Sequence, residues 1–115
     1  MKYVSHIIYG YNEEDVLKVY NLVEKKLLKE NPSLSKNYIQ EDMATYFEYY
    51  GMNYFDYNLD WGEIYIGCIM PGCETKRKFT EFLKEKEKLF KKFDEDHGTN
   101  FARNIIIYSV CRDRY

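Results

Sequence analysis

The hydrophobic residues follow two different spacings along the chain, and each change of spacing marks the border of an expected element. Residues 2–10 (KYVSHIIYG) are dense in β-branched and aromatic side chains, which is typical of a buried strand, and Gly10 ends that run. Asn12 then supplies a helix N-cap, and Pro32 restricts the residue before it, so we predict a helix that ends near Glu30. The apolar stripe of this helix comprises Val16, Tyr20, Val23 and Leu27.

A second helix and a pair of strands are expected in the middle of the chain. Ser33 or Ser35 can cap this helix, and Gly51 can end it. Its apolar face comprises Ile39, Met43, Tyr46, Phe47 and Tyr50. In the next segment, NYFDYNL, apolar and polar residues alternate, which predicts a strand whose inward side carries Phe55, Tyr57 and Leu59. Residues 60–62 (DWG) predict a hairpin loop, and EIYIGCIM predicts the returning strand.

The last third of the chain predicts one long helix and a final strand. The helix is expected from about Glu74 to about His97, and Gly98 ends it. Its apolar stripe comprises Phe79, Phe82, Leu83, Phe90 and Phe93. The segment NFARNIIIYSVC predicts the final strand, which is followed by the basic tail RDRY.

This order of elements predicts an α+β fold in a single domain that spans residues 1–115. Without the second helix, the order is βαββαβ, the ferredoxin-like plait. We therefore expect a ferredoxin-like plait with an extra helix inserted between the first helix and the central hairpin. Right-handed crossovers would place both long helices on one face of an antiparallel sheet.

Composition and charge narrow the classes of function. The net charge is −2, from 17 basic and 19 acidic residues. This near-balance favours neither strong binding to phosphate backbones nor a DNA-mimicking acidic protein. Three cysteines do not suit a disulfide framework, and the N-terminus carries no signal-peptide pattern, so we expect a cytoplasmic protein without a membrane span. Only two alanines and two prolines occur, which is typical of an AT-rich genome such as that of a low-GC bacterium, its phages or a large DNA virus.

The candidates for catalysis or metal binding are few. Cys73 falls at the start of the long helix, close to Lys76 and Arg77, which favours a thiolate there, but we prefer the simpler explanation of a small residue at a strand-to-helix turn. His6 lies in the middle of the first strand, where a hydrogen-bonded, partly buried histidine is the ordinary case. The cysteines lack the paired spacing of a zinc site, so we predict no metal and no cofactor.

The segment YFEYYGMNYFDY, residues 46–57, holds seven aromatic side chains. Helical and strand spacing assign most of them to the core, and Tyr49 and Tyr54 are left without a core position. Tyrosine and tryptophan provide large contact area at little entropic cost. We therefore expect a contact surface that is made of Tyr49, Tyr54, Trp61, Glu48 and Asp56.

Three functions remain open on these patterns. The first is a small, non-enzymatic interaction or regulatory protein that acts by protein–protein contact, such as a phage- or virus-type inhibitor of a host factor. The second is a small enzyme or ligand-binding domain whose pocket uses tyrosines with His6 or Cys73. The third is single-stranded nucleic-acid binding through sheet aromatics, with Tyr9 and Tyr65 as stacking platforms. A homodimer is compatible with each of them.

Overall fold

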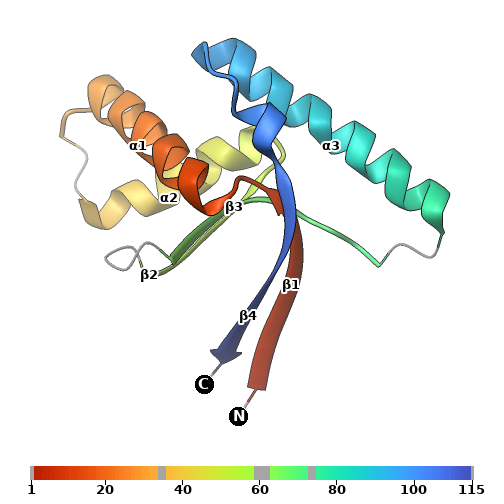
Figure 1. Cartoon of the computed structure of the whole chain (residues 1–115). Coiled ribbons are helices and arrows are strands. Elements are labelled where there is room, and N and C mark those ends of the chain that lie inside the picture. The colour runs from red at the N-terminus through yellow and green to blue at the C-terminus, as the bar shows by residue number, and fades with distance from the viewer. Residues whose placement is uncertain (1, 34–35, 59–62, 73–74, 115) are drawn as a thin grey trace.

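The computed structural model describes residues 2–33, 36–58, 63–72 and 75–114. Three helices and a four-stranded antiparallel sheet form an α+β fold in this part of the chain (Figure 1). The strands are β1 (Lys2–Gly10), β2 (Asn53–Asn58), β3 (Glu63–Ile69) and β4 (Ile106–Arg114). The helices are α1 (Glu13–Glu30), α2 (Lys36–Tyr49) and α3 (Lys76–His97), and a short 3-10 helix covers Phe101–Asn104.

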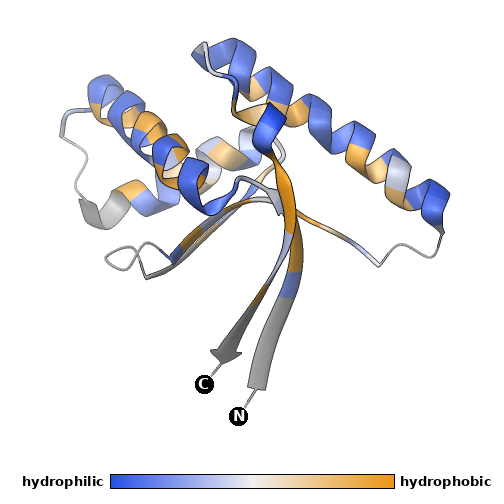
Figure 2. Ribbon diagram, viewed as in Figure 1, coloured by the Kyte–Doolittle hydropathy of each residue, from blue (hydrophilic) through white to orange (hydrophobic). Residues whose placement is uncertain are grey.

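Local sequence signals set the ends of the helices. The Asn12 side chain accepts a hydrogen bond from the Asp15 amide at the start of α1, and Thr75 accepts one from the Lys78 amide at the start of α3. Gly98 ends α3 in the left-handed conformation, with φ of 66°. Figure 2 shows hydrophobic residues recurring at helical intervals along α1 and α3. The predicted extents of these two helices are therefore confirmed to within two residues.

The strands are ordered β2-β3-β1-β4, and each neighbouring pair is antiparallel. β1 pairs with β4 from Lys2 to Gly10, but the register with β3 covers only Ile8 to Gly10. β1 and β4 therefore continue beyond β3 as a two-stranded ribbon, which projects away from the helices in Figure 1.

One crossing point brings β1 and β3 unusually close. Gly10 faces Gly67 across the two strands. A Cβ atom placed on Gly10 would lie 2.4 Å from the Ile66 carbonyl oxygen, and one on Gly67 would lie 2.6 Å from the Gly10 Cα. No side chain fits at either position, so the glycine pair permits the close approach at which the ribbon leaves β3.

All three helices contact the same face of the sheet. The Phe90 ring of α3 meets Tyr9 of β1 edge-on, with the ring centroids 5.6 Å apart. The Tyr54 ring of β2 stacks on Tyr20 of α1 and on Phe47 of α2. The core between sheet and helices also buries six further residues of the predicted helical stripes, namely Val16, Val23, Ile39, Met43, Tyr50 and Phe93. Leu27, Tyr46 and Phe82 of those stripes are only partly buried against it, and Phe79 and Leu83 are not part of the core.

The predicted facing of β2 is wrong by one residue. Tyr54 pairs with Ile66, which is buried in the core, whereas Phe55 pairs with Tyr65 on the opposite face. A shift of one position exchanges the two faces of a strand, and both faces of this strand are aromatic, so hydrophobicity alone does not distinguish them. Tyr54 therefore belongs to the core side, and the Phe55 ring stacks on His6 instead.

The final strand also differs from its prediction. Residues 101–104 form the 3-10 helix because the Asp94 carboxylate accepts hydrogen bonds from the backbone amides of Phe101 and Ala102. β4 begins only at Ile106 and continues through the predicted basic tail as far as Arg114. The predicted hairpin loop at 60–62 lies outside the described residues.

Candidate functional site

The sheet face opposite the helices carries its own set of side chains. The register places Tyr65 of β3 and Tyr108 of β4 on this face, opposite the core residues Ile64 and Ile66. We call it the open face. His6 and Phe55 stack on it with their ring centroids 5.6 Å apart. The open face is therefore rich in aromatic side chains.

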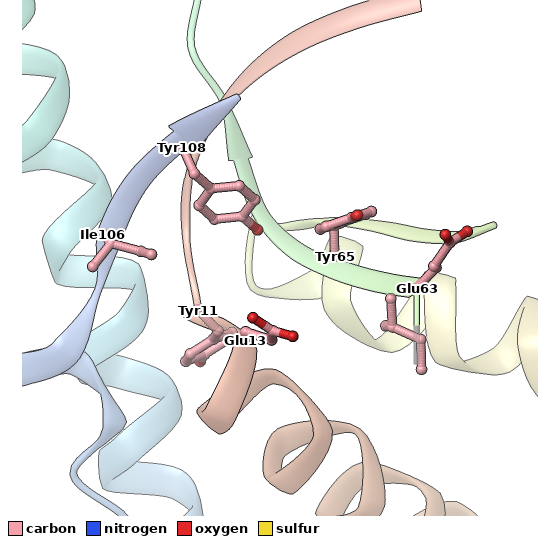
Figure 3. Close-up of a pocket in the computed structure, with 7 residues that line it drawn as sticks. Tyr11, Glu13, Glu63, Tyr65, Ile106 and Tyr108 are labelled. Carbon is pink, nitrogen blue, oxygen red and sulfur yellow. The ribbon is translucent and has the colours of Figure 1, made fainter. Parts of the chain in front are cut away.

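A pocket of about 380 Å³ lies at the helix-proximal end of the open face (Figure 3). It is lined by Tyr11, Glu13, Glu63, Ile64, Tyr65, Ile106 and Tyr108. Figure 3 shows Tyr108 reaching from β4 toward β3, with Glu13 at the start of α1 and Glu63 farther along β3. The volume is within the range of small-ligand sites.

Two tyrosine rings meet in this pocket across strand β1. The ring centroids of Tyr65 and Tyr108 lie 6.0 Å apart, and the ring planes are tilted by 39°. β1 separates their strands in the sheet, and its paired Gly10 has no side chain that could stand between the rings. The glycine crossing therefore allows the two rings to meet.

The Tyr108 hydroxyl is buried and makes no hydrogen bond within the described part of the chain. Burial raises the pKa of Tyr108, and the nearby Tyr65 raises it further. Tyr108 consequently stays neutral at physiological pH and can donate one hydrogen bond and accept others. An unsatisfied hydroxyl is costly in a folded protein, and Tyr11 of the same pocket also has a buried hydroxyl without a hydrogen bond in the described part of the chain.

The charged groups of the pocket are both carboxylates. Glu13 and Glu63 belong to its lining, and the lining includes no lysine, arginine or histidine. Glu13 also lies in the first turn of α1, where a negative charge is favoured by the helix dipole. The pocket thus combines ring faces, a neutral hydroxyl and acceptor-only charged groups.

Among the predicted contact residues, Tyr49 and Tyr54 lie in different surroundings. Tyr49 is 80% exposed, and Glu48 beside it is exposed as well. Tyr54 lies in the core wall, where its hydroxyl donates a hydrogen bond to the Gln40 side chain. Asp56 is described only as a backbone partner of Ile64, and Trp61 lies outside the described residues.

The C-terminal ends of α2 and α3 are joined by a polar and aromatic cluster beneath Tyr49. The Tyr46 hydroxyl contacts Nε2 of His97, while Nδ1 of that ring lies 2.7 Å from the Phe93 carbonyl. The carbonyl can only accept, so Nδ1 carries a proton and donates to the Phe93 carbonyl. The Tyr50 hydroxyl donates to Asp96 at 2.7 Å. Tyr46 and Tyr50 therefore serve as structural contacts between α2 and α3.

The other predicted chemical residues are placed apart from the pocket. His6 is partly buried and stacked on Phe55, and Cys73 lies outside the described residues. Cys68 is buried in the core, where burial raises the pKa of its thiol to about 11. Among the described residues, no group of three or more histidine, cysteine or acidic side chains is placed to hold a metal ion.

The sequence interpretation misses most of the pocket. Tyr65 is among the aromatic residues that the sequence places on the sheet, but the spacing singles out neither Glu13 nor Tyr108 as a site residue. Tyr108 alternates with Ile106 and Val110, so period two could have placed these three on one face. Which face stays uncovered depends on the strand order, which spacing along the chain does not specify.

Comparison of the chain with protein-family models, curated proteins and solved structures finds no match. None of the helices in the described ranges combines the length and the apolar character needed to cross a membrane. A function must therefore be inferred from the geometry of the open face.

Proposed function

We propose that this protein is a small, non-enzymatic interaction protein that binds a protein partner through the open face of its sheet. The observation that carries the proposal is the pocket on that face, whose lining includes the rings of Tyr65 and Tyr108. Aromatic residues around a hollow are characteristic of the anchor sites of protein interfaces. The exposed side chain of Ile106 at the pocket adds apolar contact area.

The strand order supports a finer assignment of the fold. The order β2-β3-β1-β4, with antiparallel neighbours, is the one expected when two βαβ units interlock. We propose a ferredoxin-like plait in which α2 is the inserted helix. In that arrangement the helices occupy one face, and the other is left for binding.

The same pocket supports a second candidate, a domain that binds a small ligand. Its lining offers tyrosines and carboxylates rather than the histidine or cysteine that the sequence suggested. Single-stranded nucleic acid fits this face poorly, because Glu13 and Glu63 would repel phosphates. Inhibition of a host factor by a phage or viral protein stays a hypothesis about the partner, motivated by the AT-rich composition alone.

The proposal can be tested by partner capture with three matched variants. Ile106→Arg places a long charged side chain at the pocket, Leu28→Arg makes the same change on the exposed end of α1, and Tyr49→Ala removes the exposed ring of α2. We expect one stoichiometric partner to bind the wild type, the Leu28 variant and the Tyr49 variant but not the Ile106 variant. A partner that is lost only with Tyr49→Ala would place the contact on α2 and contradict the proposal.

A further inference from the structure

The ionisable side chains that line the pocket carry one sign of charge. Its two ionisable side chains at neutral pH, Glu13 and Glu63, are acids, and its polar wall groups are tyrosine hydroxyls. The lining itself contributes no basic side chain. An entering anion would be repelled, whereas an entering cation would gain charge-assisted hydrogen bonds.

The aromatic walls favour the same kind of ligand. The rings of Tyr65 and Tyr108 lie 6.0 Å apart and are tilted relative to each other, so they present faces in two directions. The face of an aromatic ring is negative, and it attracts an ammonium or guanidinium group within about 6 Å of the ring centre. Both rings belong to the lining of the pocket.

We infer that the pocket binds an organic cation, and that this cation is the lysine or arginine side chain of the protein partner. This inference rests on the proposed function and specifies which kind of partner side chain contacts the open face. A long, flexible basic side chain can enter a pocket of about 380 Å³ while the partner backbone lies across the exposed Ile106. The pocket then acts as the anchor site, and the surrounding open face provides apolar contact.

The inference is tested with small probes that carry the cation without a partner. The probes are Nα-acetyl-arginine amide, Nα-acetyl-citrulline amide, in which a neutral urea replaces the guanidinium, and spermidine as a free polyamine. Ligand-observed NMR titration at low ionic strength measures their affinities. We expect saturable binding of the arginine probe with a dissociation constant on the order of 1 mM, weakening as salt is added, and no saturable binding of the citrulline probe.

Two glutamate variants locate the cation in the pocket. Glu13→Gln combined with Glu63→Gln removes both pocket carboxylates, and we expect it to weaken the arginine probe about fivefold. Glu14→Gln is the matched control, because Glu14 lies in the same helical turn but faces Lys18 on the exposed surface of α1. We expect this control to bind the arginine probe like the wild type.

The outcomes separate the inference from the proposed function. The cation site would be overturned if the arginine and citrulline probes bound equally well, or if Glu14→Gln weakened the arginine probe as much as the double glutamate variant does. In that case, loss of partner binding in the Ile106→Arg variant would still support the open face as the contact surface. Spermidine binding far more tightly than the arginine probe would overturn the assignment of the cation to a protein side chain. Binding of the arginine probe without any Ile106-dependent partner would overturn the proposed function and keep the cation site.

Discussion

At the scale of single residues, the tyrosines of this protein have different structural roles. Tyr50 is buried between α2 and α3, and its hydroxyl donates to the Asp96 carboxylate. That hydrogen bond, together with one from Lys92, lowers the pKa of Asp96. Tyr108 differs, because its hydroxyl is buried and makes no hydrogen bond within the described part of the chain. The same residue type thus serves as a structural donor in one place and as a candidate binding group in another.

Removing the Tyr50 hydroxyl should change how stability depends on pH. The pKa of Asp96 is lower in the folded state than its ordinary value of 3.8, so its stabilising contribution is present above that value and is lost as the pH falls through the folded pKa. We expect Tyr50→Phe to be less stable than the wild type at pH 6, with the gap closing below about pH 3.8. Urea unfolding between about pH 2.5 and pH 7 measures this, with the exposed Tyr49→Phe as control. A gap that stays constant with pH would contradict the role of the bond.

Cys68 should be an unreactive thiol in the folded protein. Burial raises its pKa to about 11, and only the thiolate reacts readily with alkylating reagents. We expect its alkylation rate to keep rising from about pH 7 to pH 9.5 without reaching a plateau, and to increase sharply once the protein is unfolded. Mass spectrometry of the variant Cys73→Ser/Cys111→Ser measures this single site. A plateau below about pH 9 would contradict the assignment.

At the scale of elements, the glycine crossing between β1 and β3 decides the shape of the open face. Gly10 and Gly67 allow the two backbones to approach, and the ribbon of β1 and β4 continues past that point. Tyr65 and Tyr108 meet across this crossing. A side chain at either glycine would therefore affect both the pairing of the strands and the pocket.

A methyl group at this crossing should be strongly destabilising. Gly67→Ala places a Cβ within 2.8 Å of backbone atoms of β1 and of the Ile8 side chain, so we expect the free energy of unfolding to fall by about 3 kcal/mol. Gly72→Ala is the matched control, because a Cβ added there would have nothing within 4 Å, and we expect a change within about 0.5 kcal/mol. Chemical denaturation compares the two variants. Equal stability of both would show that the strands do not approach closely here.

The helices and strands also show which structural features can be predicted from the spacing of residues along the chain. The cap at Asn12 and the end of α3 at Gly98 follow from the sequence, because helix ends are set by neighbouring residues, whereas the cap at Thr75 is not predicted. The facing of β2 does not follow, because Tyr54 and Phe55 are both aromatic and only packing against Phe47 selects one of them. The 3-10 helix at 101–104 depends on Asp94, a contact that no periodic pattern contains.

At the scale of the whole molecule, the two faces of the sheet have different roles. One face is covered by all three helices and holds the core, whereas the open face presents a pocket with tyrosine walls and two carboxylates. The sequence predicts the α+β class and most of the core, but the pocket joins residues of α1, β3 and β4 that are distant in the chain. These residues become neighbours only through the strand order β2-β3-β1-β4.

The location of the bound cation tests most directly whether the open face is the binding surface. Amide NMR spectra of the isotope-labelled protein, recorded as Nα-acetyl-arginine amide is added, report which residues sense the probe. We predict saturable shifts for residues 63–66 and 106–108 and for Glu13, with little change at residues 48–50 at the C-terminal end of α2. Shifts that cluster at residues 48–50 and 96–97, or shifts that do not saturate anywhere, would contradict the claim that the open face is the binding surface.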